Sequence, residues 1–240
     1  MTSLAFAAVR LPAALDRRQP CLTEVPLRVS PPSWTCQTPV LLLHGYLGTE
    51  AAWTPLAERL HAAGFRHVYT FGYDSLSVGV PELAASLVDA AHMIAAQTGQ
   101  PAVHVVGHSL GGVIARYAVQ QLRLHVLTPT VVMIATPYRG VGLARLGPGP
   151  AAAQLRSTST LLRQLPPLAQ TPAVRWAAIY GSADFVVPPP PTGHDLSLSG
   201  YGHHSILHST ELATTVITHL TAPHNPRATQ QCDTINSLAA

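Results

Sequence analysis

Apolar runs that alternate with amphipathic stretches dominate the middle of the chain. Several runs are apolar at nearly every position, which is typical of strands buried on both faces of a sheet. The runs predict strands at residues 40–44, 68–72, 103–107, 131–135, 176–181 and 195–200. Between them, helical spacing of apolar residues predicts helices at 53–63, 81–97, 111–124 and 210–220. Strands alternating with helices predict an α/β fold with a doubly wound, mainly parallel sheet of about six strands.

The ends of the chain differ from this pattern. Six prolines punctuate residues 1–39, which we expect to form an extended N-terminal arm and not a second domain. Residues 223–240 are polar and are expected to form a peripheral C-terminal tail. A single domain therefore spans residues 40–222. Its longest connection, residues 137–175, is expected to be either a small lid or a helix that covers the sheet.

Composition narrows the function classes. The chain has 240 residues, enough for one domain with a substantial core. Its net charge of +3 is mild and no basic run is present, so we expect no nucleic-acid partner. The longest apolar runs are far shorter than a membrane span. The first residues lack the basic region and long apolar core of a secretion signal, so we expect either a cytoplasmic protein or one whose leader is absent from this sequence.

The three cysteines, Cys21, Cys36 and Cys232, define neither a disulfide framework nor a metal site. Cys21 and Cys36 could pair if the protein is exported. Reduced structural thiols are the expected state of all three, and no metal or other cofactor is predicted.

A G-x-S-x-G box at residues 107–111 directly follows a predicted strand and opens a predicted helix. A strand, a sharp turn and a helix form the context in which such a box becomes a nucleophile elbow, with the serine hydroxyl exposed at the strand tip. The flanking glycines are needed where any Cβ would collide with a neighbouring strand or helix. We therefore predict that Ser109 is a nucleophile. The alternative is an ordinary glycine-rich turn between a strand and a helix.

A serine hydroxyl needs an adjacent base, which a carboxylate holds in its working tautomer. Between Ser109 and the histidines near residue 203, the only carboxylates are Asp184 and Asp195. Asp184 lies in a turn directly after the strand at 176–181, whereas Asp195 opens the next strand at the opposite end. Asp184 is therefore the predicted acid.

His203 is the predicted base, because it follows Gly202 at the tip of the loop after the last strand. His204, one residue further along, is the alternative base. The spacing of His203, His204 and His208 lacks a convincing acid or cysteine partner for a metal site.

Acyl transfer also needs donors for the oxyanion of the tetrahedral intermediate. One is the backbone N–H of Leu110, the residue after the nucleophile. The second is expected from the loop at 44–48, where we choose the N–H of Tyr46, and His44 is expected to be a structural support for that loop. The side chains of Tyr46 and Leu110 are then free to line an acyl pocket. Further candidates for the pocket are His108, Tyr138, Val186 and Val187.

Residues 40–220 resemble the bacterial triacylglycerol lipases and esterases of the α/β-hydrolase fold, in particular the small ones with little or no lid. The matching segments, in order, are 43–48, 107–117, 134–137, 178–184 and 202–207. The resemblance implies a triad of Ser109, Asp184 and His203, an oxyanion hole from the amides of Tyr46 and Leu110, and a six-stranded form of the fold that works without metal. The sequence departs from these relatives in the length of 137–175 and in four consecutive prolines at 188–191.

These features predict a serine hydrolase that cleaves carboxylic esters through an acyl-enzyme. Its substrate would be a small-molecule or lipid ester, with transient contact with a lipid interface. The same triad could instead serve an acyltransferase, an amidase or a polyester hydrolase, because fold and triad do not fix the acceptor. A non-catalytic binding protein of this fold is the third reading, but such proteins usually lose a triad member and all three positions are filled here.

Overall fold

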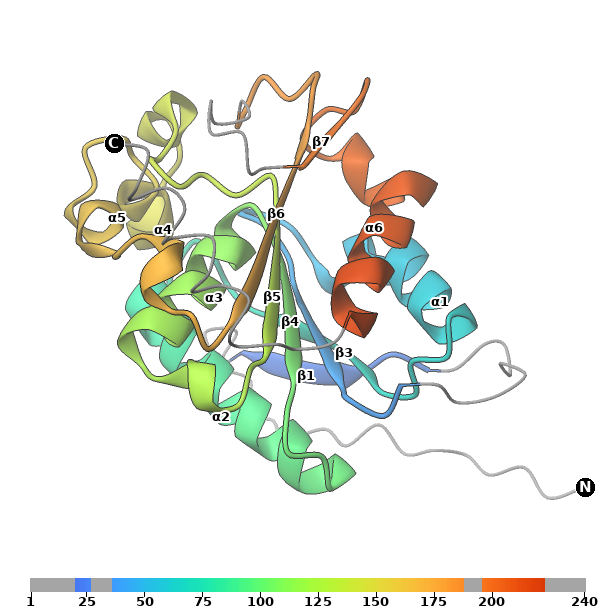
Figure 1. The fold of residues 1–240 in the computed structure, drawn as a ribbon. Helices are drawn as coiled ribbons and strands as arrows, with labels where there is room; N and C mark the ends of the chain where they lie inside the picture. Colours follow the sequence, from blue (N-terminus) through green and yellow to red (C-terminus); the bar gives the residue numbers. More distant parts are fainter. Residues whose placement is uncertain (1–19, 27–35, 188–195, 223–240) are drawn as a thin grey trace, which may run out of the picture.

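A seven-stranded, mainly parallel sheet runs through the molecule (Figure 1). The computed structural model describes residues 20–26, 36–187 and 196–222. The strands are β1 (Cys21–Glu24), β2 (Val40–Leu43), β3 (Val68–Gly72), β4 (His104–His108), β5 (Thr130–Ile134), β6 (Arg175–Gly181) and β7 (Leu196–Leu198). Their order is β1-β3-β2-β4-β5-β6-β7, and β2 to β7 are mutually parallel. The predicted doubly wound, mainly parallel sheet is confirmed.

The prediction of about six strands misses one edge strand. β1 pairs antiparallel with β3, with Cys21 opposite Gly72 and Glu24 opposite Tyr69. It lies inside the segment predicted to be an extended arm. Its sequence does not indicate a strand, because the four residues are mostly exposed and carry no apolar run.

Helices cover both faces of the sheet (Figure 1). On one face are α2 (Val80–Thr98) and α3 (Leu110–Gln121), and on the other are α1 (Thr54–Ala62) and α6 (Thr210–Thr221). Successive strand residues alternate between two cores: Leu41 packs in the core beneath α2 and α3, and Leu42 in the core beneath α1 and α6. This alternation is the two-residue period of a strand buried on both sides.

The long connection at 137–175 contains four short helices. They are η3 (Gly142–Arg145), α4 (Gly149–Gln154), α5 (Thr160–Gln164) and η4 (Leu168–Gln170). Ser159 begins α5 by accepting a hydrogen bond from the amide of Leu162. At its far end the connection is held to α3, because the Arg116 guanidinium donates to the carbonyls of Leu165 and Pro166, at 3.2 and 2.8 Å. The connection lies beyond the carboxyl ends of the strands (Figure 1).

Parallel strands bring all their carboxyl ends to one edge of the sheet, where ligands bind in doubly wound folds. The segments that follow these ends carry His44, Ser109, Thr136, Asp184 and His203. The remaining short helices, η1 (Glu50–Trp53), η2 (Leu124–Val126) and η5 (Ser205–His208), complete the loops. These polar residues therefore gather at one edge of the sheet.

Cys21 and Cys36 are both free thiols, and Cys232 lies outside the described residues. Among the helices of the described ranges, none combines the length and apolar character needed to cross a membrane. The prolines at 188–191 also lie outside the described residues.

Candidate active site

Ser109 occupies a strained turn between β4 and α3. Its φ of 51° and ψ of −115° are unusual for a residue with a side chain. The backbone can turn this tightly only because of the glycines around it. A Cβ on Gly107 would come within 2.5 Å of the carbonyl carbon of Gly111, and one on Gly111 would overlap the carbonyl oxygen of Leu43. The amide of Ser109 donates to the carbonyl of Ile134 at 2.8 Å, which ties the turn to β5.

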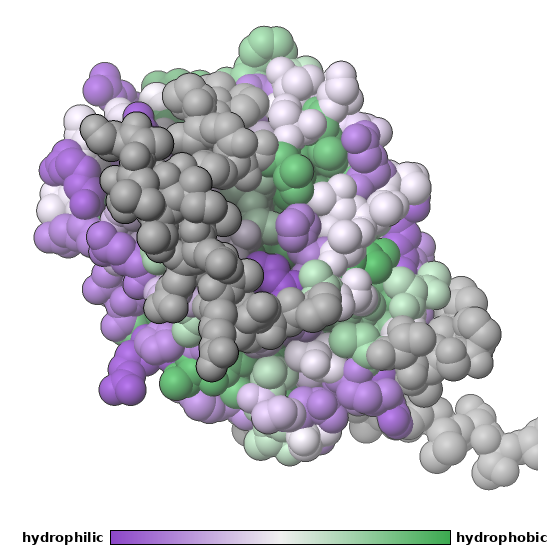
Figure 2. Space-filling view, in the orientation of Figure 1, coloured by the Kyte–Doolittle hydropathy of each residue, from purple (hydrophilic) through white to green (hydrophobic). Residues whose placement is uncertain are grey.

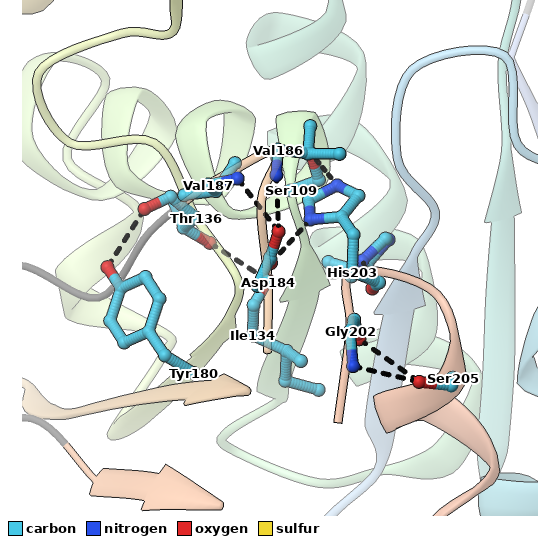
Figure 3. A network of polar contacts seen from close by, with 11 residues as sticks. Ser109, Ile134, Thr136, Tyr180, Asp184, Val186, Val187, Gly202, His203 and Ser205 are labelled. Carbon is cyan, nitrogen blue, oxygen red and sulfur yellow. Dashed lines mark hydrogen bonds and ion pairs between the residues drawn. The ribbon is translucent and has the colours of Figure 1, made fainter. Parts of the chain in front are cut away.

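The three predicted triad residues form a continuous chain of hydrogen bonds (Figure 3). His203 Nδ1 is 2.8 Å from Asp184 Oδ2, and His203 Nε2 is 3.0 Å from Ser109 Oγ. A carboxylate can only accept, so Nδ1 carries the proton and donates to Asp184. Nε2 is then free to accept the hydroxyl proton of Ser109. All three side chains are buried, and this arrangement can activate a serine hydroxyl as a nucleophile.

Asp184 is held as a charged carboxylate. Burial by itself would raise its pKa, but hydrogen bonds from His203 and from the amides of Val187 and Val186 outweigh burial, so the pKa lies below its ordinary value. Both amides donate to Oδ1 at 2.8 Å, which leaves Oδ2 for the imidazole. The turn after β6 therefore fixes both the charge and the direction of this side chain.

The backbone of His203 is held on both sides. The amide of Gly202 donates to Ser205 Oγ at 2.9 Å. His108 Nε2 donates to the carbonyl of His203 at 2.9 Å, and the two rings lie 4.7 Å apart. His108 directly precedes Ser109, so this hydrogen bond ties the serine turn to the loop that carries the predicted base, 95 positions further along the chain.

His108 is neutral in the folded protein. Burial, and next the proximity of His203, lower its pKa from the ordinary 6.5 to about 3. A neutral ring at this position adds no positive charge beside His203.

His108 is expected to make folding sensitive to acid. Between pH 6.5 and about 3 the unfolded chain binds a proton at this residue and the folded chain does not, so stability falls as the pH falls through this window. A two-unit drop costs roughly 2 to 3 kcal/mol from this group. In urea unfolding at pH 6 and pH 4, the His108→Gln variant should lose less stability than the parent protein by that amount.

A matched control is His92→Gln, which replaces an exposed histidine on α2. This variant should keep the parent's pH dependence. Equal losses of stability in the parent and in the His108→Gln variant would contradict a neutral, buried His108.

The loop after β2 lies directly against the serine turn. A Cβ on Gly45 would come within 2.9 Å of His108 Nδ1 and 3.2 Å of Ser109 Cβ, so glycine permits this close approach. His44 supports the loop: its Nδ1 donates to the Gly45 carbonyl at 2.8 Å and its Nε2 accepts from the Tyr73 amide at 3.3 Å. Its ring also stacks on Tyr73, with centroids 4.0 Å apart. Burial lowers the pKa of His44, consistent with a neutral structural role.

Two backbone amides near Ser109 have no acceptor among the described residues. The amide of Leu110 is the first of α3 and therefore lacks a partner within the helix. The amide of Tyr46, in the loop against Ser109, likewise donates to no described group. Amides left open beside a serine hydroxyl can receive an oxyanion.

A pocket of about 190 Å³ opens beside Ser109 and His203. Its walls are mostly apolar, and most of them come from the connection at 137–175. The apolar lining residues are Pro137, Val141, Leu143, Ala144, Ala152, Leu155, Val186 and Val187. The pocket can therefore take a short hydrocarbon group next to the serine.

Some of the predicted lining residues border this pocket and others do not. His108, Val186, Val187 and the Tyr46 side chain line it. Leu110 does not, because α3 buries its side chain in the core beneath α2 and α3. Tyr138 does not line the pocket either, because its ring packs beside Arg116 and Tyr180.

His204, the alternative base, lies at the edge of the pocket, with its ring 5.1 Å from that of His203. The structure brings His203, and not His204, within hydrogen-bond distance of Ser109 and Asp184. Burial, and next the proximity of His203, lower the pKa of His204.

The sequence prediction missed the pocket walls from 137–175. Their only sequence signal is a set of apolar residues in the longest connection, and nothing in their spacing says which of them face Ser109. Within the described residues no group of three or more His, Cys, Asp or Glu side chains is arranged to hold a metal ion.

Comparisons with known proteins agree with this architecture. A family model for the alpha/beta hydrolase family matches residues 40–229. Lysophosphatidylserine lipase ABHD12 of Rattus norvegicus and of Mus musculus is 32% identical over 109 residues, which cover 42% of this chain. The match spans about a quarter (27%) of the length of those relatives.

Two solved structures share the fold at low sequence identity. The mature lipase BlEst2 of Bacillus licheniformis superposes with a TM-score of 0.67 at 17% identity, covering 82% of this chain and 95% of that one. Lipase B of Aspergillus fumigatus gives a TM-score of 0.67 at 16% identity, covering 80% and 54%. At such identities the likeness bears on the fold alone.

Proposed function

Because the chain belongs to the alpha/beta hydrolase family, we propose that it is a serine hydrolase that cleaves carboxylic esters. The observation that carries the proposal is the hydrogen-bonded chain from Ser109 through His203 to Asp184, beside two open amides. Cleavage of a carboxylic ester uses such a nucleophile, base and oxyanion site together. Two of its structural neighbours are lipases, which supports the same class.

The proposed reaction begins when Ser109 Oγ attacks the ester carbonyl carbon and His203 Nε2 takes the hydroxyl proton. The carbonyl oxygen becomes an oxyanion that the amides of Tyr46 and Leu110 stabilise. His203 returns the proton to the leaving alkoxide as the C–O bond breaks, which leaves an acyl group on Ser109. Water then attacks the acyl-enzyme with His203 again as base, and the acid leaves. Asp184 stabilises the transient imidazolium in both halves.

We infer that the acyl group is short. The pocket volume of about 190 Å³ corresponds to roughly six groups the size of a water molecule, at ~30 Å³ each. Its apolar walls favour a hydrocarbon chain, and the polar residues lie at the serine end. Acyl chains of about four to six carbons fill such a space.

A panel of substrates tests the proposal. We expect nitrophenyl esters from acetate to hexanoate to be hydrolysed faster than the laurate ester, and the corresponding nitroanilides to be hydrolysed far more slowly. Emulsified triglycerides in the same panel distinguish an esterase from a true lipase. Product analysis with a competing alcohol separates hydrolysis from acyl transfer. If no ester is cleaved and a fluorophosphonate does not label the protein, a non-catalytic binding protein is favoured.

The α4 residue Ala152 is expected to limit acyl length. It is buried and lines the pocket, so Ala152→Leu adds methyl groups to the acyl site. One methylene in a hydrophobic pocket is worth about 10-fold or more in rate, so the ratio of hexanoate to acetate kcat/KM should fall by about 10-fold.

The matched control is Ala153→Leu, which adds the same volume on the same helix at an exposed position. This variant should keep the parent's ratio. An unchanged ratio in the Ala152→Leu variant would show that the acyl chain does not bind in this pocket.

A further inference from the structure

Exposed hydrophobic side chains gather around the mouth of the pocket. Four of the seven large hydrophobic residues that are exposed in the described ranges belong to the mouth or adjoin a lining residue. They are Leu47, Leu143, Leu146 and Phe185, with exposed fractions of 63%, 53%, 83% and 93%. Figure 2 shows hydrophobic residues at the upper centre of one face, beside a hollow, with hydrophilic residues along its flanks. Such a concentration on a folded surface marks an interaction site.

Arginines without carboxylate partners accompany these side chains. Arg139 and Arg145 are exposed and lie on the connection that forms the pocket wall. Within the part of the chain that the structure describes, neither forms an ion pair, since both recorded pairs join a histidine to a carboxylate. Residues 90–183 contain no aspartate or glutamate at all. The wall of the mouth is therefore positively charged as well as apolar.

We propose that the mouth face, defined by Leu47, Leu143, Leu146, Phe185, Arg139 and Arg145, docks on the surface of an anionic phospholipid layer. The apolar side chains would enter the boundary between headgroups and acyl chains, and the guanidinium groups would pair with lipid phosphates. Each arginine near an anionic surface is attracted to it, and salt weakens this attraction. A lipid layer fits this face because it offers phosphates to the arginines and acyl chains to the apolar side chains, next to a pocket that is lined by Ser109.

This inference rests on the proposed function only in that the mouth leads to the proposed ester-cleaving site. Docking itself needs no chemistry, so it can be measured in a Ser109→Ala background. Failure of docking would leave hydrolysis of soluble esters untouched, and failure of hydrolysis would leave docking untouched.

The opposite edge of the sheet provides a matched control. There, η2 carries the exposed Val126, with an exposed fraction of 70%, and the exposed Arg123 precedes it. The double change Arg123→Gln with Val126→Ser removes one guanidinium and one exposed hydrophobic side chain. The double change Arg145→Gln with Leu146→Ser removes the same groups from the mouth face, and neither residue lines the pocket.

Co-sedimentation with sucrose-loaded vesicles tests the proposal on the full chain. The Ser109→Ala protein should bind phosphatidylglycerol vesicles at least 10-fold more tightly than phosphatidylcholine vesicles, and 0.5 M NaCl should reduce this preference. The Arg145→Gln/Leu146→Ser change should weaken binding to phosphatidylglycerol by at least 10-fold, of which roughly fivefold is expected from the arginine. The Arg123→Gln/Val126→Ser change should have no effect.

Three results would overturn the proposal. They are equal binding by the two double variants, equal binding to the two lipids, and a mouth-face change that alters the size-exclusion volume but not vesicle binding. The last result would assign the face to a second copy of the chain. In the Ser109-containing protein, both double variants should hydrolyse a soluble butyrate ester at the parent rate, which shows that they are folded.

Discussion

Replacing Ser109 with alanine is expected to lower kcat for a nitrophenyl butyrate ester by about 10⁵- to 10⁶-fold, the scale found when the nucleophile of a serine triad is removed. The hydroxyl is the group that His203 Nε2 contacts at 3.0 Å, and no other serine in the described residues is hydrogen-bonded to this imidazole. The residual rate would come from the open amides and the pocket alone.

Labelling with a fluorophosphonate should disappear in the same variant. The alanine fits the turn as well as the serine, so the thermal midpoint should change little. Ser157→Ala, at an exposed position in the connection, is the matched control and should keep both activity and labelling. If the Ser109→Ala variant kept its activity, Ser109 would not be the nucleophile.

Replacing Asp184 with asparagine is expected to lower kcat by about 10⁴-fold without unfolding the protein. The asparagine oxygen can still accept from the amides of Val186 and Val187, so the turn after β6 stays in place. Its NH₂ group would then face His203 Nδ1 and donate to it. The imidazole must in that case carry its proton on Nε2, where it can no longer accept the proton of Ser109.

The expected signature is therefore a loss in kcat with a near-normal KM and a near-normal thermal midpoint. Asp89→Asn, which replaces an exposed carboxylate on α2, is the matched control and should behave like the parent protein. An Asp184→Asn variant with parental kcat would mean that the carboxylate supports only the loop.

The sequence determined the local parts of the candidate site. The glycines at 107 and 111 indicate the tight turn from the sequence alone, because the close packing of strand, turn and helix leaves no room for a Cβ at these positions. Asp184 could be predicted because only two carboxylates lie between Ser109 and His203, and of these only Asp184 follows the carboxyl end of a strand. The alternation of apolar runs and helical patterns likewise predicted the sheet and its four covering helices.

Tertiary packing decided the rest. Several features of the site join segments that are far apart in the sequence. They are the hydrogen bond from His108 to the carbonyl of His203, the pocket walls at 141–155 and the contact of the Tyr138 ring with Arg116. β1 and the choice of His203 over His204 depend on contacts of the same kind. Hydrophobic periodicity states which face of an element is buried, but it carries no information on which distant side chain lies opposite. That pairing is set by how the elements pack around one core, so it is found only in the folded chain.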